Sequence, residues 1–124
     1  MVEIKKVTDR RLAQRICSDC GITWQEDQHV IATLDRDDVL NYAVFTYDGE
    51  IGTIYAIGGF ENDILMLDGL CRAILNIMDL NGVKYAYLPL KYDELAKKVG
   101  FSNENEQYVL QLEGFFCCKC NDKH

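Results

Sequence analysis

Proline and linker-like tracts are scarce in this sequence. It contains one proline among 124 residues, and no stretch is dominated by proline, glycine or serine. Such stretches mark linkers and low-complexity segments, and internal repeats are missing as well. The composition, 48% hydrophobic and 27% charged, is that of a globular chain. We therefore expect a single domain over residues 1–124.

Long apolar runs are also missing. Charged residues interrupt every apolar stretch well before the roughly 20 residues that a membrane-spanning helix requires. The opening stretch MVEIKKVTDRR is charged and has no apolar segment behind it, unlike a secretion signal. We expect a cytoplasmic protein that has no membrane partner.

Basic residues are outnumbered by acidic ones. Lysine and arginine total 13 against 20 aspartates and glutamates, which gives a net charge of −7 and a pI of about 4.7. A surface of this sign repels nucleic acid, so we expect no nucleic-acid partner. It would mildly favour a cationic substrate, although the same charge also serves solubility alone.

The cysteines allow two interpretations. Six cysteines are too few for a disulfide scaffold, and a reducing compartment argues against disulfides. A zinc site would take its ligands from Cys17, Cys20, Cys118 and Cys120. Against this, the first two share a helical face with Leu12 and Ile16, where thiols act as small buried apolar groups. Near a helix C-terminus a C-x₂-C pair is also poorly placed for redox chemistry. We expect no metal.

Hydrophobic periodicity predicts the order β-α-β-β-β-α-β-α-β(β). Strands are expected at residues 2–7, 29–34, 39–47, 51–59, 83–90 and 107–112, with one or two strands after residue 100. Helices are expected at residues 8–21, from Asp63 or Asp68 to about residue 80, and at 91–100. Residues 24–29 fit a short helix or a loop. The order predicts an α+β (α/β) fold, with a mixed β-sheet flanked by helices.

Three phrases in this order resemble the GNAT family of acyl-CoA-dependent N-acetyltransferases. DGEIGTIYAIGG resembles the family's third turn and central strand, and DGLCRAILNIMDLNGVKYAYL resembles its main helix and the next strand. ELAKKVGF resembles a short helix that ends at glycine before the last hairpin. The phrases cover nearly the whole chain, and residues 115–124 lie outside the pattern. The resemblance implies the GNAT fold.

The resemblance also implies acetyl-CoA as cosubstrate. In the family it lies where two parallel strands splay apart, here IGTIYAIG and VKYAYL, and its pantetheine arm pairs with the first strand. The implied cofactor-binding residues are Tyr55, Ala56, Ile57, Gly58, Gly59 and Asn62. The pyrophosphate sits on the N-terminus of the main helix, where free amide groups attract anions.

Two departures from the family pattern concern the chemistry. The phosphate phrase Q/R-x-x-G-x-G/A is replaced by GGFENDILMLDG, a degenerate loop that carries Glu61 and Asp63. The tyrosine that protonates the leaving thiolate is replaced by Ala96. Tyr92, one turn earlier, is the candidate catalytic residue, with a surface tyrosine as the alternative. For a base, Glu61 is the acid nearest the strand, and His29 and His124 are the two histidines.

The sequence thus predicts a GNAT-like N-acetyltransferase that transfers an acyl group from acyl-CoA to a small-molecule or protein amine. The alternative is a catalytically inactive GNAT-fold binding or regulatory protein. Phe115 and Phe116 close the core or contact a partner, and a homodimer is possible.

Overall fold

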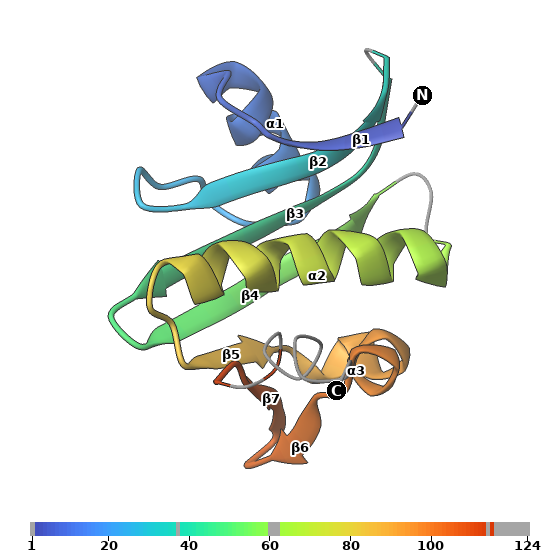
Figure 1. Ribbon diagram of the computed structural model, residues 1–124. Helices are drawn as coiled ribbons and strands as arrows, with labels where there is room; N and C mark the ends of the chain where they lie inside the picture. Colours follow the sequence, from blue (N-terminus) through green and yellow to red (C-terminus); the bar gives the residue numbers. More distant parts are fainter. Residues whose placement is uncertain (1, 37, 60–62, 114, 116–124) are drawn as a thin grey trace.

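The computed structural model describes residues 2–36, 38–59, 63–113 and 115, which form one mixed β-sheet with helices on both faces (Figure 1). The described strands are ordered β1-β2-β3-β4-β5-β7-β6 across the sheet. Neighbouring strands are antiparallel, apart from β4 and β5, which are parallel. The predicted fold class is confirmed.

The element order also agrees with the prediction. The strands are β1 (Val2–Lys6), β2 (His29–Asp35), β3 (Asp38–Asp48), β4 (Ile51–Gly59), β5 (Tyr85–Leu88), β6 (Ser102–Glu104) and β7 (Gln107–Gln111). The helices are α1 (Arg10–Asp19), α2 (Ile64–Leu80) and α3 (Asp93–Val99), with a 3-10 turn η1 (Leu90–Tyr92) before α3. Residues 24–28 form a loop and turn, and two strands rather than one follow residue 100.

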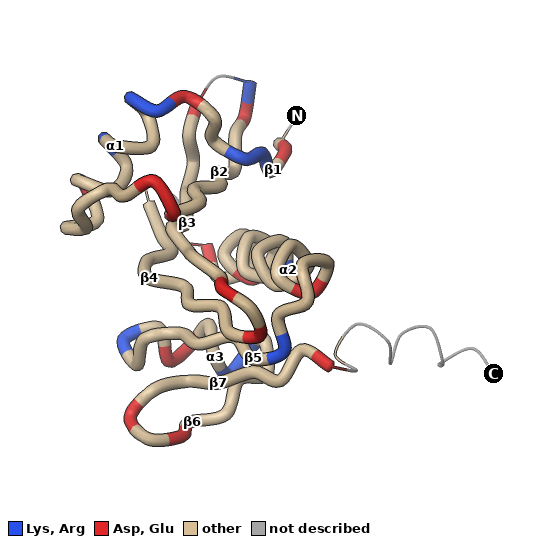
Figure 2. Tube along the Cα trace, turned by 90° about the vertical axis from the view of Figure 1, so that its left-hand side faces the viewer, with Lys and Arg blue, Asp and Glu red and all other residues tan. Residues whose placement is uncertain are grey.

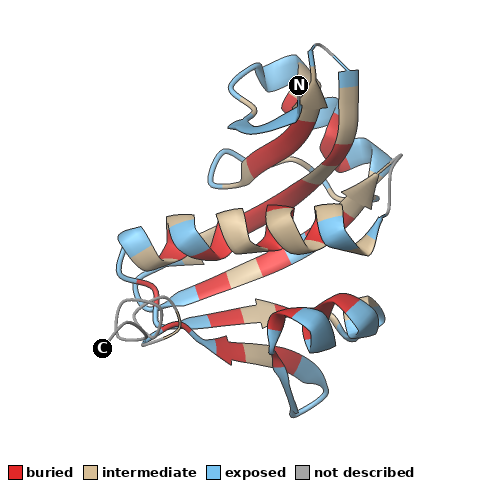
Figure 3. Ribbon diagram, turned by 45° about the vertical axis from the view of Figure 1, so that its right-hand side comes forward, coloured by how far each residue is buried: buried red, intermediate tan, exposed pale blue. Residues whose placement is uncertain are grey.

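Helix α2 packs the core on one face of the sheet. Its buried side chains recur at three- and four-residue spacing: Leu67, Leu70, Cys71, Ile74, Leu75 and Met78. They contact inward residues of β2, β3 and β4, such as Ile31, Phe45 and Ile54, and α3 joins the same cluster. Figure 3 shows the buried face of α2 turned toward the strands.

Helix α1 covers the opposite face. Ala13, Ile16 and Cys17 pack against Val30 and Val44, which directly precede core residues on the other face of their strands. Because side chains alternate along a strand, α1 and α2 lie on opposite sides of the sheet. The Asp9 side chain caps α1 by accepting from the Arg11 amide at 2.9 Å.

Phe115 closes the core. It is half-buried against the α2 cluster, and the Arg72 guanidinium lies 5.7 Å from its ring centroid. This agrees with the core-closure alternative for the EGFF stretch, whereas Phe116 lies outside the described residues. In the described part of the chain no helix is long and apolar enough to cross a membrane.

Candidate functional site

The parallel strands β4 and β5 separate after a short paired region. Their last paired residues are Thr53 and Tyr87, yet β4 continues to Gly59. Over this stretch β4 remains paired to β3, as far as Gly59 opposite Asn41. The second half of β4 therefore has a backbone edge that β5 does not cover, which is the kind of edge that an extended ligand can join.

A β-bulge at Tyr55 marks the point of separation. Val44 pairs with Ala56 and Phe45 with Ile54, so Tyr55 has no partner on β3. The extra residue keeps Ile54 and Ile57 on the same core face although they are three positions apart. A bulge bends its strand and increases the local twist, which accounts physically for the separation of β4 from β5.

A pocket of about 260 Å³ lies along the uncovered edge of β4. Its lining residues come from four elements: Ala56, Ile57, Gly58 and Gly59 of β4, Lys91 and Tyr92 of η1, Asp19 and Cys20 at the end of α1, and Tyr42 of β3. We call this the gap pocket. It unites four of the six predicted cofactor residues with the predicted catalytic residue.

The other two predicted cofactor residues are not in the gap pocket as described. The Tyr55 side chain is 43% exposed, and its hydroxyl lies 3.3 Å from the Thr46 hydroxyl. Asn62 lies outside the described residues, and so does Glu61, the acid nearest the strand. The contribution expected from Tyr55 was through its backbone, and that stays a prediction.

Tyr92 spans the gap. Its hydroxyl accepts a hydrogen bond from the backbone N–H of Ile57 at 3.1 Å. Residue 92 is half-buried, and its ring contacts the α2 core. The Tyr92 hydroxyl therefore accepts the hydrogen bond that the Ile57 N–H could otherwise donate to an extended ligand lying along β4. Ala96, at the family's tyrosine position, is fully buried in the core and does not line the pocket.

Cys20 and Tyr42 form a polar pair at the side of the gap pocket. Burial raises the pKa of the Cys20 thiol, and the Tyr42 hydroxyl that donates to it acts in the opposite direction. A thiol with a raised pKa stays protonated at neutral pH and is a poor nucleophile. Sequence periodicity placed Cys20 in the core stripe, and no motif identified Asp19, Tyr42 or Lys91 as pocket residues.

The other described cysteines also have raised pKa values. Burial raises the pKa of Cys17, which donates to Gln28 Oε1 at 3.7 Å, and raises the pKa of Cys71 to about 12. In the part of the chain that the structure describes, no group of three or more histidine, cysteine or acidic residues could hold a metal. Cys118 and Cys120 of the zinc interpretation lie outside it.

The N-terminus of α2 carries its own carboxylate. Asp63 caps the helix, and its Oδ1 accepts from the Leu65 amide at 2.8 Å. The helix begins at Ile64, so Gly69 lies within its second turn, while Asp68 pairs with Arg72 at 3.1 Å. An anion at this terminus would meet the Asp63 charge as well as the favourable helix dipole.

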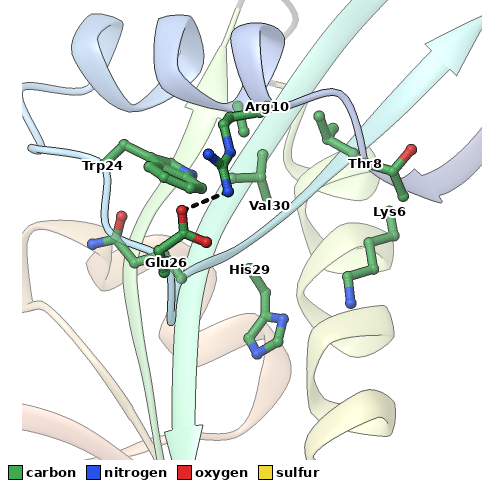
Figure 4. A pocket seen from close by; sticks show the side chains of 10 residues that line it. Lys6, Thr8, Arg10, Trp24, Glu26, His29 and Val30 are labelled. Atoms are coloured by element: carbon green, nitrogen blue, oxygen red, sulfur yellow. Dashed lines mark ion pairs between the residues drawn. The ribbon is translucent and has the colours of Figure 1, made fainter.

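His29 belongs to a different pocket, on the other side of β2 from the gap. Its ring stacks on Phe45 and Tyr47, with centroids 5.3 and 4.9 Å away. Burial lowers its pKa, and Lys6 acts in the same direction. Figure 4 shows this pocket, where Arg10 pairs with Glu26 at 2.6 Å. It shares no lining residue with the gap pocket, so His29 is not placed as the base.

Gly59 fixes the end of the gap, and alanine there should be strongly destabilising. Its φ is +133°, and an added Cβ would lie 2.7 Å from the Asn41 Cα. We expect Gly59→Ala to lower the unfolding free energy by about 3 kcal/mol in urea titrations. The control is Gly69→Ala, where a Cβ meets nothing within 4 Å; it should stabilise α2 by up to about 1 kcal/mol. Equal effects of the two substitutions would contradict this account of Gly59.

Comparison with known proteins identifies the fold. No family model and no curated protein matches the sequence. Among solved structures, a putative GNAT acetyltransferase from Desulfovibrio desulfuricans is 15% identical with a TM-score of 0.69, covering 90% of this chain and 99% of its own. The ribosomal-protein-S18-alanine N-acetyltransferase from Escherichia coli is 13% identical with a TM-score of 0.66, covering 88% of this chain and 90% of its own.

A third similar structure was determined with acetyl-CoA bound. A GNAT family acetyltransferase from Elizabethkingia anophelis, with acetyl-CoA bound, is 12% identical with a TM-score of 0.64. The match covers 89% of this chain and 97% of that one. Identities this low establish architecture rather than activity. The chain has the fold of the GNAT acetyltransferases, as its phrases had indicated.

Proposed function

We propose that this protein is an acyl-CoA-dependent N-acyltransferase that acetylates a small-molecule or protein amine in the cytoplasm. The observation that carries the proposal is the uncovered edge of β4 from Ile54 to Gly59, lined by the gap pocket. A pantetheine arm has amide groups that can pair with such an edge as a further strand does. A similar fold is solved with acetyl-CoA bound.

Tyr92 is proposed to assist the leaving group. In the transfer, the amine nitrogen attacks the thioester carbonyl, the C–N bond forms, and the C–S bond breaks to give a thiolate. The Tyr92 oxygen accepts from the Ile57 amide, so its own proton stays available for donation to the thiolate. The proton that the attacking amine loses passes to water or to groups that surround the amine substrate.

The phosphate end of acyl-CoA is proposed to be held weakly. Asp63 already accepts an amide of the first turn of α2, and its charge opposes a pyrophosphate there. We therefore propose that the loop is degenerate and that the affinity comes mainly from the pantetheine portion. The same observation favours a second candidate, a GNAT-fold protein that binds a ligand or partner in the gap without catalysis.

Calorimetric titration with acetyl-CoA, together with a release assay for free CoA thiol over a panel of amines, tests the proposal. Saturable binding and amine-dependent thiol release support the transferase. Saturable binding without release from any amine supports the second candidate. Absence of heat and of any melting shift with acetyl-CoA, up to millimolar ligand, would contradict the transferase, and the second candidate would then require a ligand or partner other than acetyl-CoA.

A further inference from the structure

Three exposed apolar side chains gather at one edge of the molecule. Val2, Ile4 and Leu65 are 54%, 41% and 66% exposed. All three line a groove of about 320 Å³ between β1 and the first turns of α2. The floor includes Gly69, where a side chain would meet nothing within 4 Å. Exposed apolar side chains clustered in this way are typical of a surface that contacts another molecule.

The groove runs beside an open sheet edge. β1 is the terminal strand and pairs only with β2 among the described residues. Val7, directly after β1, donates its N–H to the Val30 carbonyl of β2 at 2.8 Å. Backbone groups alternate in direction along an antiparallel strand, so Lys5 and Glu3 also face β2. Val2, Ile4 and Lys6 consequently direct their N–H and C=O groups outward.

The charges of β1 complement those of a second β1. Along β1 the side chains of Glu3 and Lys5 alternate with those of Val2 and Ile4. Glu3 and Lys5 form an exposed ion pair at 3.1 Å, and Glu3 is also among the residues that line the groove. Figure 2 shows the acidic and basic ends of this strand. In a two-fold antiparallel pairing centred on Ile4, residue 3 lies opposite residue 5 of the other copy. Each Glu3 then faces a Lys5, and opposite charges across strands stabilise the pair.

We propose that β1 pairs with β1 of a second copy of this chain, around a two-fold axis at Ile4. Reciprocal backbone hydrogen bonds form at Ile4 and between Val2 and Lys6. On the groove side the two Ile4 side chains meet, and each Val2 packs against the stem of the partner's Lys6. Charged side chains on an edge strand usually prevent such pairing. Here the negative Glu3 of each copy lies opposite the positive Lys5 of the other, so the charges favour the pairing. The pairing joins the two sheets into one continuous sheet.

The sharpest test is a charge swap followed by mixing. Glu3→Lys places lysines opposite each other, and Lys5→Glu places glutamates opposite each other, so each variant alone should shift to monomer in sedimentation velocity. An equimolar mixture should recover a dimer, because every cross-strand pair is again complementary. Glu50→Lys disrupts an equally exposed ion pair with Lys84 (3.2 Å) and should stay dimeric like the wild type.

A second measurement does not depend on how the variants fold. Amide hydrogen exchange of the wild type should show protection of Ile4 and Lys6 that grows with protein concentration. A wild type that is monomeric throughout the micromolar range, with these amides unprotected, overturns the proposal and leaves the groove to another kind of partner. A dimer that persists in both charge variants also overturns it, because such a dimer uses another face.

Discussion

Replacing Tyr92 by phenylalanine is expected to lower kcat about a hundredfold, the low end of what general acid catalysis contributes. The same change should tighten acetyl-CoA binding by about threefold, because the Ile57 amide no longer has a hydrogen bond to give up. A lower kcat together with tighter acetyl-CoA binding distinguishes a group that acts on the leaving thiolate from one that only fills space. Steady-state kinetics and calorimetry on the same preparation measure both.

Tyr85→Phe is the matched control. Tyr85 opens β5, is 41% exposed and does not line the gap pocket, so its hydroxyl should affect neither kcat nor acetyl-CoA affinity. A Tyr92→Phe variant with wild-type kcat would remove Tyr92 from the chemistry. If its affinity fell instead of rising, pantetheine would not be using the Ile57 amide.

Replacing Asp63 by asparagine is expected to tighten acetyl-CoA binding by about tenfold. Asparagine caps a helix as well as aspartate does, so α2 should still begin at Ile64. The substitution removes one negative charge from the helix N-terminus, and one charge at close range is worth about 1 kcal/mol or more against a pyrophosphate. S-acetylpantetheine has no phosphate, and its affinity should not change.

Asp79→Asn controls for net charge, because it removes the same charge from the last turn of the same helix. It should leave acetyl-CoA affinity near the wild-type value. If Asp63→Asn tightened S-acetylpantetheine as much as acetyl-CoA, or had no effect on either, the pyrophosphate would not lie on α2.

The local sequence pattern was enough to predict the main helices and strands. Alternation and the Gly58-Gly59 end placed β4 at residues 51–59, as observed. The apolar spacing from Leu67 to Met78 identified α2, and Asp63 was one of the two predicted starts. These features depend on propensity, capping and periodicity, which neighbouring residues determine.

The gap itself depends on contacts between distant parts of the chain. The separation of β4 from β5 follows from the bulge at Tyr55. This bulge can be recognised only from the pairing of β4 with Val44 and Phe45 of β3. The GNAT resemblance implied this gap, whereas hydrophobic periodicity alone could not predict it. The bond from Ile57 to Tyr92 joins residues 35 positions apart, and it forms because η1, after Pro89, turns Tyr92 back toward β4. The sequence pattern predicts one helix over residues 91–100, and nothing in that pattern indicates the 3-10 turn at Leu90–Tyr92.

The most direct measurement follows the Ile57 amide by ¹H–¹⁵N NMR while acetyl-CoA is added. If the pantetheine arm pairs with β4, the amides of Ile57, Gly58 and Gly59 should show the largest saturable shifts, and Asp63→Asn should reach saturation at lower ligand concentration. Shifts confined to other elements, or no saturable shift at millimolar acetyl-CoA, would contradict the proposal that this gap binds an acyl-CoA.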